Sequence, residues 1–189
     1  MDKGKKLVYV SEDLCEEAKK ASRELGYSLI KFVESSVALG LSAAKLGYTP
    51  ERASEVLSAL RAQRALGGAF VPQGVLNLIA EGPEELRKEL LRASYEAGLA
   101  HGRYLREKSQ DPLQSLKTFL EVTRWDLSEV EVEQEGRTFK LRCVSTSHTA
   151  RATELLTKFV EGLISGLGYQ VQKVDWMRGI IIVEFRAGP

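Results

Sequence analysis

The hydrophobic pattern of the first fifty residues predicts one short strand followed by two helices. Residues 5–10 end in β-branched and aromatic side chains, as strands do. Ser11 and Ser28 are N-cap residues for helices over 11–26 and 28–47, and each helix ends at a glycine. Each helix carries one apolar stripe, formed by Leu14, Ala18, Ala21 and Leu25 in the first and by Phe32, Val33, Val37 and Leu41 in the second. An isolated strand leaves its backbone groups unpaired, so the pattern predicts that residues 5–10 pair with the same strand of a second copy.

Residues 49–85 are predicted to form a helical connector. A helix begins at Pro50, directly after the N-cap Thr49, and ends before a pair of glycines. A break over 70–74 is followed by a short apolar segment, 75–80, which is also predicted to be helical. The first helix could transmit a signal between the two ends of the chain, or it could simply connect them while packed on its neighbour.

From residue 83 onward the pattern predicts an α+β domain. Helical periodicity over 83–108 and 112–124 gives way to strict alternation over 129–143, which predicts an antiparallel hairpin with one face in water. A third helix and two more strands are predicted over 149–167, 169–176 and 180–186. The run 180–183 is apolar at every position, which predicts packing against both faces of the last strand. The domain is therefore expected to have four antiparallel strands and three helices.

Two glycines stand inside the predicted helix over 83–108. Gly98 and Gly102 each lower the stability of a helix by about 1 kcal/mol relative to alanine. Glycine at such positions usually allows another element or a ligand to approach the backbone closely. The sequence therefore predicts a close contact along this side of the helix.

The composition removes several classes of protein from consideration. The formal net charge is +1, so the whole chain has neither the strong basic nor the strong acidic character that points to a partner. No apolar stretch approaches the roughly 20 residues of a membrane-spanning helix, and no signal peptide precedes the first strand, so we expect a cytoplasmic protein with no membrane partner. Cys15 and Cys143 lack the spacing of a zinc site or a disulfide framework, so no metal or cofactor is expected.

Two motifs near the N-terminus follow the order strand, cap, helix, glycine and second cap: Val8-Tyr9-Val10-Ser11-Glu12-Asp13-Leu14 and Leu25-Gly26-Tyr27-Ser28-x3-Phe32-Val33. Together they resemble a ribbon-helix-helix domain, the dimeric DNA-binding family of many small bacterial and archaeal repressors. The resemblance implies that alternate strand residues enter the major groove, while the second helix offers its N-terminal amides to a phosphate. The residues implied to contact DNA are Lys5, Leu7, Tyr9, Ser28, Leu29 and Lys31.

An alternative is a ribbon that only dimerises and never touches DNA. Direct reading of bases usually uses arginine, asparagine or glutamine, whereas Leu7 and Tyr9 offer an apolar surface and one hydroxyl. Residues 1–48 contain eight Lys or Arg and seven Asp or Glu, so this segment has a net charge of only +1. Both observations favour the alternative.

The C-terminal half carries a second set of spaced motifs: Ala97-Gly98-x3-Gly102 and Phe159-x2-Gly162-Leu163-Ile164-x2-Leu167-Gly168-x2-Val171. Together with the glycine-turned hairpin that follows, they are similar to the 4-vinyl reductase domain, whose fold is shared with subunits of trafficking particles and with haem-type nitric oxide sensors. The resemblance implies a pocket for a small, mainly apolar molecule between the long helix and the sheet. The candidate ligand-binding residues are Tyr95, His101, Tyr104, Phe119, Trp125 and Trp176. Many members hold a metal through cysteines near the last hairpin, and this chain has none there, so no metal is expected.

The residues that could perform acid–base chemistry are sparse. His101 and His148 are the only histidines, and a lone histidine is more often a surface or hydrogen-bonded residue than a ligand or catalyst. Asp126 and Asp175 are interpreted as turn or edge residues, and residues 145–148 as the loop and cap before the helix over 149–167. No phosphate-binding loop or carboxylate pair is evident, so we do not expect an enzyme.

The sequence as a whole predicts three segments. These are a ribbon-helix-helix domain over 1–48, a helical connector over 49–85 and an α+β ligand-binding domain over 86–189. The predicted function is a ligand-responsive transcriptional regulator, which binds DNA as a homodimer and whose C-terminal domain binds a small effector. The alternative is a dimeric scaffold protein related to the trafficking subunits.

Overall fold

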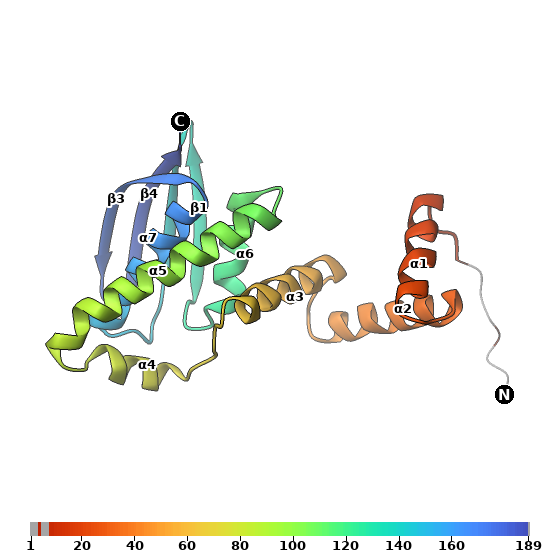
Figure 1. Cartoon of the computed structure of the whole chain (residues 1–189), viewed down its shortest axis with the longest axis horizontal. Helices are drawn as coiled ribbons and strands as arrows, with labels where there is room; N and C mark the ends of the chain where they lie inside the picture. The colour runs from red at the N-terminus through yellow and green to blue at the C-terminus, as the bar shows by residue number, and fades with distance from the viewer. Residues whose placement is uncertain (1–3, 5–7, 189) are drawn as a thin grey trace. The chain divides into compact units, whose positions relative to one another are not determined.

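The computed structural model describes residues 4 and 8–188, and these residues form two compact units (Figure 1). The N-terminal unit is Met1–Ser54 and the C-terminal unit is Glu55–Pro189. The division lies inside one helix, α3 (Pro50–Ala65), and the rest of the predicted connector belongs to the same unit as the sheet. The two units are therefore described separately.

The N-terminal unit contains the two predicted helices, α1 (Glu12–Glu24) and α2 (Leu29–Lys45). The hydroxyl of Ser11 accepts a hydrogen bond from the amide of Leu14, and the hydroxyl of Ser28 accepts one from the amide of Lys31. Both capping residues are thus confirmed in the role that the sequence assigns to them. Gly26 and Gly47 have φ angles of 69° and 81°, which end the two helices in the left-handed region.

The predicted strand over residues 5–10 is only partly described. Lys5 and Leu7 lie outside the described residues, and residues 8–10 are not part of any strand in the described chain. The side chain of Tyr9 is 89% exposed, and its neighbours Val8 and Val10 are exposed as well. A ribbon made from two copies of this segment would need a second chain, so it stays a prediction.

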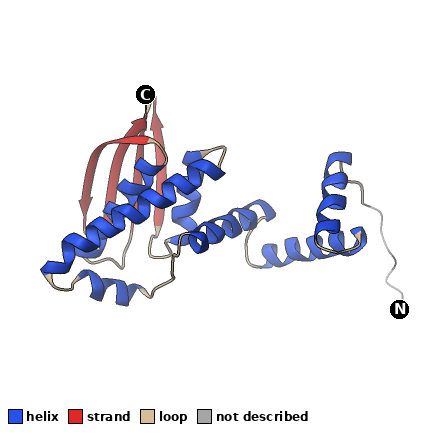
Figure 2. Cartoon of the chain, in the orientation of Figure 1, coloured by secondary structure: helices blue, strands red, loops and turns tan. Residues whose placement is uncertain are grey.

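The C-terminal unit has the α+β architecture that the sequence predicts (Figure 2). The sheet contains four antiparallel strands in the order β1-β2-β4-β3, built from two hairpins on either side of α7 in the sequence. Besides the larger part of α3, the elements are α4 (Gln73–Ala80), α5 (Glu84–Lys108), α6 (Pro112–Thr123), β1 (Glu129–Glu135), β2 (Thr138–Val144), α7 (Ala150–Gly166), β3 (Tyr169–Met177) and β4 (Ile180–Ala187).

The two faces of the sheet differ in character. One face carries the core, where Leu141, Val183 and Phe185 are fully buried together with residues of α6 and α7. The other face carries paired charges, such as Arg142 of β2, which contacts the carboxylates of both Glu129 and Glu131 on β1. In strand β4, Ile181 and Val183 are buried, whereas Ile180 and Ile182 are half-buried. One face of this strand is therefore fully packed, as predicted, and the other face is only partly covered.

The glycines of α5 mark its contact with α7. A Cβ atom added at Gly98 would lie 2.0 Å from the carbonyl oxygen of Phe159, and one at Gly102 would lie 2.2 Å from that of Leu163. The contact is reciprocal, because a Cβ atom at Gly162 of α7 would lie 2.1 Å from the carbonyl oxygen of Tyr95. The two helices touch backbone to backbone, so the close contact predicted from these glycines is with another element and not with a ligand.

Candidate functional site

The six predicted ligand-binding residues do not gather around one cavity. Phe119 is buried in the core and contacts His101, with 5.2 Å between ring centroids, while Tyr95 and Tyr104 are half-buried on α5. Trp176 is 41% exposed on β3, and Trp125 is 74% exposed after α6. Of the six, Trp125 lines the pocket described below and the other five do not.

The contacts of His101 are those of a structural residue. Its Nδ1 atom lies 2.8 Å from the carbonyl oxygen of Ala97, and its Nε2 atom lies 2.9 Å from the side-chain amide of Gln63 on α3. Burial lowers the pKa of His101, although the bond to the Ala97 carbonyl acts in the opposite direction. Both ring nitrogens are occupied, so His101 is a hydrogen-bonded core residue and does not present a free atom to a ligand.

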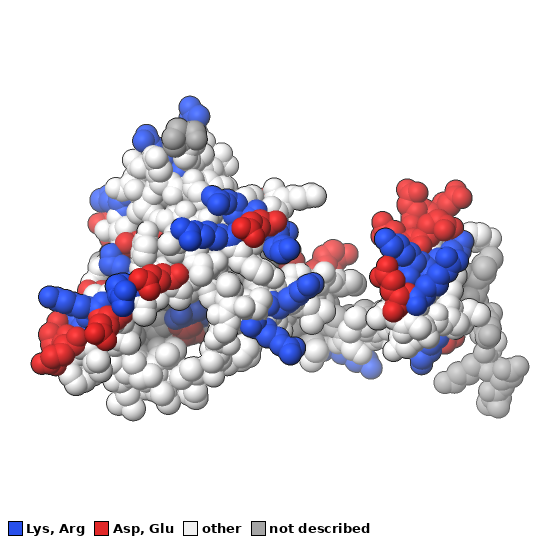
Figure 3. Space-filling view, in the orientation of Figure 1, with Lys and Arg blue, Asp and Glu red and all other residues white. Residues whose placement is uncertain are grey.

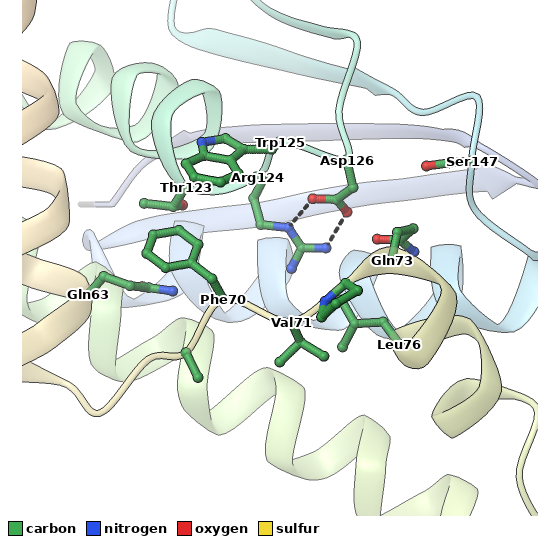
Figure 4. Close-up of a pocket in the computed structure, with 12 residues that line it drawn as sticks. Gln63, Phe70, Val71, Gln73, Leu76, Thr123, Arg124, Trp125, Asp126 and Ser147 are labelled. Atoms are coloured by element: carbon green, nitrogen blue, oxygen red, sulfur yellow. Dashed lines mark hydrogen bonds and ion pairs between the residues drawn. The ribbon is translucent and has the colours of Figure 1, made fainter.

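The structure places a pocket elsewhere, beneath α4 and the segment before it (Figure 4). One hollow of about 490 Å³ lies between residues 69–73, the end of α6 and Ser147, and a second of about 340 Å³ lies between α4, α5 and α7. The two hollows share Gln73, Leu76 and Arg124, and we refer to them together as the α4 pocket. At the first hollow the rings of Phe70 and Trp125 are stacked, with 4.9 Å between their centroids.

A charged cluster lies at the junction of the two hollows. The guanidinium group of Arg124 donates two hydrogen bonds to the carboxylate of Asp126, at 3.0 and 2.6 Å (Figure 4). The Nε2 atom of His148 lies 2.5 Å from the same carboxylate, and the His148 side chain is buried. Burial opposes ionisation of Asp126, but the hydrogen bonds from His148 and Arg124 outweigh it and hold the pKa of this carboxyl well below its usual value.

This cluster adds a contact that the sequence does not predict. As expected from the sequence, Asp126 lies in a turn and His148 lies in the loop before α7, and in the structure the two side chains are also direct partners. His148 does precede the N-cap of α7, Thr149, but its ring points inward and its carbonyl oxygen accepts a hydrogen bond from Arg178. The two partners are 22 positions apart in the sequence, which carries no local signal of the contact, because only the folded chain brings them together.

We expect the variant Asp126→Asn to be less stable by about 3 kcal/mol at pH 7, because Arg124 and His148 would lose a buried ionised partner. A carboxyl whose pKa is lowered by folding stabilises the protein above its unfolded pKa of about 4 and loses that contribution as the pH falls. Wild-type stability should therefore fall more steeply below pH 4 than that of the variant. Urea unfolding followed by tryptophan fluorescence between pH 7 and pH 3 measures both effects.

Asp175→Asn is the matched control for this experiment. Asp175 is also paired with a cation, Lys173, but its side chain is 55% exposed. An exposed pair contributes about 1 kcal/mol or less, so the control should unfold nearly as the wild type does. Equal acid sensitivity in the wild type and in Asp126→Asn would show that the carboxylate of Asp126 is not stabilised by its partners.

The cysteines and carboxylates do not form a metal centre in the described part of the chain. Within residues 4 and 8–188, no three His, Cys, Asp or Glu side chains gather closely enough to hold a metal ion. Cys143 lies on the core face of β2, and burial raises the pKa of its thiol to about 12. A thiol of this kind is a structural residue and a poor nucleophile at neutral pH.

No protein-family model matches the chain, and no curated protein matches it either. Within the part of the chain that the structure describes, no helix is both long enough and apolar enough to cross a bilayer. The fold and the α4 pocket therefore define the class of protein by themselves. It is a two-unit α+β protein whose C-terminal unit contains a mainly apolar pocket beside a buried charged cluster.

Proposed function

We propose that the chain is a ligand-responsive transcriptional regulator that binds DNA as a homodimer through its N-terminal unit. The observation that carries the proposal is the pair of capped helices of the N-terminal unit, which follow the segment predicted to be a strand in the order of a ribbon-helix-helix domain. The separate C-terminal unit supports the second half of the proposal, because it contains a pocket suited to a small effector.

The apolar side chains of the N-terminal unit support a homodimer. The stripes along α1 and α2 remain largely exposed in the single chain, although apolar side chains of a stable domain are usually buried. The exposed large apolar residues of this unit are Val8, Tyr9, Val10, Leu14, Leu25, Tyr27, Ile30, Val33, Val37, Leu39, Leu41, Leu46 and Tyr48. A second copy would cover these faces and also supply the partner strand for the ribbon.

The start of α2 supports contact with a phosphate group. The first backbone amides of a helix have no partner within the helix, and its dipole attracts negative charge to this end. Lys31 stands in this first turn and adds a positive charge, with no acidic residue in the turn. We therefore propose Ser28, Leu29 and Lys31 as DNA contacts, together with the exposed Tyr9. Lys5 and Leu7, the other contacts implied by the resemblance, lie outside the described residues.

Gel-shift titrations on genomic DNA fragments at several salt concentrations test the proposal. We expect some fragments to bind about 10³-fold or more tightly than bulk DNA at physiological salt. Lys31→Ala should weaken binding to all sequences, because one phosphate contact is lost. It should also reduce the magnitude of the slope of log affinity against log salt concentration by about 1. Lys45→Ala, at the opposite end of the same helix, is the control and should bind as the wild type does. Affinity for every fragment equal to that for bulk DNA would refute the proposal.

The second candidate is a dimeric scaffold that does not bind DNA. It is favoured by Leu7 and Tyr9 on the ribbon, which are poor readers of bases, and by the near-neutral charge of residues 1–48. Figure 3 shows acidic and basic side chains intermixed on the visible face of α1, without a basic stripe. A scaffold would form the same dimer and fail the gel-shift test.

A further inference from the structure

We propose that the α4 pocket binds a neutral molecule with an apolar body and a head group that donates two hydrogen bonds and accepts one, for which a primary carboxamide is the simplest example. This inference rests on the proposed sensor function, because it names the ligand class of the same unit. It starts from two buried polar atoms that lack a partner among the described residues, Oε1 of Gln73 and Nδ1 of His148. Both residues line the same hollow of the pocket.

The orientation of Gln73 follows from a chain of hydrogen bonds. The carbonyl oxygen of Ser147 can only accept, so the side-chain nitrogen of Asn77 donates to it, at 3.0 Å. The side-chain oxygen of Asn77 then accepts from the nitrogen of Gln73, at 2.9 Å. Oε1 of Gln73 is therefore left as a buried acceptor without a donor, so a ligand at this position would have to donate a hydrogen bond to it.

The ring of His148 presents a second acceptor. Its Nε2 atom carries a proton, because the carboxylate of Asp126 beside it only accepts. In the neutral imidazole Nδ1 is then an unprotonated acceptor, buried and without a partner. A buried acceptor without a donor costs about 1–3 kcal/mol, which a ligand that donates to it would recover.

Arg124 supplies the complementary donor. Its Nε and Nη2 atoms donate to Asp126, and Nη1 makes no hydrogen bond to the other residues drawn in Figure 4. The carboxylate of Asp126 already balances the positive charge of Arg124, so the pocket offers a donor without demanding a negative charge. A neutral head group with one acceptor and two donors matches these three atoms in number and in kind.

The walls of the pocket determine the rest of the ligand. Apolar side chains of α4, α5 and α7 line the second hollow, and they include Leu76, Ile79, Leu90, Leu155, Leu156 and Phe159. Its volume of about 340 Å³ lies within the range of small-molecule sites. An aliphatic or similarly apolar body of modest size would therefore fill it.

Two other head groups fit less well. A carboxylate would bring acceptor oxygens against the two acceptors of Gln73 and His148, next to the ionised Asp126. An alcohol has one donor and would leave one of the two acceptors without a partner. We therefore expect the affinity order carboxamide, alcohol, carboxylate for molecules with the same body.

Binding of octanamide, octanol and octanoate to the full-length protein at pH 8 tests the inference, with isothermal titration calorimetry as the readout. We expect octanamide to bind about tenfold more tightly than octanol, as one additional satisfied acceptor predicts, and octanoate to bind most weakly. Gln73→Leu should weaken the binding of octanamide about tenfold and weaken the binding of octanol less. Gln172→Leu, at an exposed glutamine outside the pocket, should change neither.

A pair of alanines on α5 locates the binding site. Ala93 lines the pocket and is exposed at its rim, so Ala93→Trp should block octanamide binding without disturbing the core. Ala100 is exposed on the same helix but does not line the pocket, so Ala100→Trp should bind as the wild type does. Binding that survives Ala93→Trp, absence of octanamide binding at millimolar concentration, or equal or tighter binding of octanoate would each overturn the inference.

The outcome is separable from that of the proposed function. Calorimetry needs no DNA, so the predicted head-group order together with a failed gel-shift test would leave the ligand class standing and remove the regulator. Specific DNA binding without any head-group preference would support the regulator and remove the proposed ligand class. Octanamide that binds as predicted and also shifts the affinity for DNA would support both.

Discussion

The variant Gly98→Ala is expected to lower the free energy of unfolding of the C-terminal unit by about 3 kcal/mol or more, the upper end of the range for overpacked cores. The added Cβ atom would lie 2.0 Å from the carbonyl oxygen of Phe159 and 2.9 Å from the amide nitrogen of Leu163. Both of these are backbone atoms of α7 and cannot rotate away as a side-chain end could. The helices would have to separate, and the packing between them would loosen along its length.

Urea unfolding followed by tryptophan fluorescence measures this effect. Both tryptophans, Trp125 and Trp176, belong to the C-terminal unit, so the signal reports on the unit that contains the substitution. Gly74→Ala is the matched control, because a Cβ atom there would meet nothing within 4 Å and the residue lies in α4. That variant should be unchanged or more stable by up to about 1 kcal/mol. A loss below about 1 kcal/mol in Gly98→Ala would contradict the close backbone contact.

The variant Val37→Lys is expected to weaken the proposed homodimer at least about 30-fold, which corresponds to about 2 kcal/mol. Val37 belongs to the apolar stripe of α2 and is 59% exposed in the single chain. In a dimer that covers this stripe, a lysine would bury a charge without a partner. Since folding of such a unit is coupled to association, the variant should also lose helical content at low protein concentration.

Sedimentation equilibrium over a range of protein concentrations measures the dissociation constant, and circular dichroism at the same concentrations measures the helical content. Ser42→Lys is the control, because Ser42 is a polar and exposed residue of the same helix, α2. With 3.6 residues per turn its side chain lies on the side of α2 opposite the predicted stripe, so the dimer should keep the wild-type affinity. A wild-type protein that sediments as a monomer, or a Val37→Lys variant that dimerises normally, would remove the dimer from the proposal.

Local structure could be predicted largely from the sequence, because its causes are local. Ser11 and Ser28 accept hydrogen bonds from amides three residues later, so the cap and the start of each helix are encoded side by side. The change of period from 3.6 to 2 after residue 124 likewise located the hairpin of β1 and β2 and its turn at Gly136. The α+β class followed from the order of these elements.

The candidate site could not be predicted in the same way. Gln73, the pair Arg124 and Asp126, and His148 come from three separate segments, and none of them stands in a spacing that marks a site. The aromatic residues chosen as ligand contacts were selected for their surface area, yet Phe119 and His101 belong to the core. Area and polarity of a side chain do not say which way it points, since packing decides that.

The glycines illustrate how much each level of description contributes. From the sequence alone, Gly98 and Gly102 indicated a close approach to the long helix, because glycine in a helix interior lowers stability and needs a compensating contact. The sequence did not determine whether a ligand or another element made that approach. The tertiary structure shows that the approaching element is α7, whose own Gly162 completes the contact. The pocket therefore does not lie on this face of the helix.

The sequence by itself determined the helices, the four strands of the C-terminal sheet, the serine caps and the α+β class of this protein, because hydrogen bonds and hydrophobic periodicity act between residues a few positions apart. It also predicted a dimer, since an isolated strand over residues 5–10 would leave its backbone groups unpaired. Only the tertiary structure decided which polar atoms are buried without partners and where a ligand could satisfy them. Burial and the pairing of Asp126 with His148 depend on contacts between distant segments, which a linear pattern does not encode.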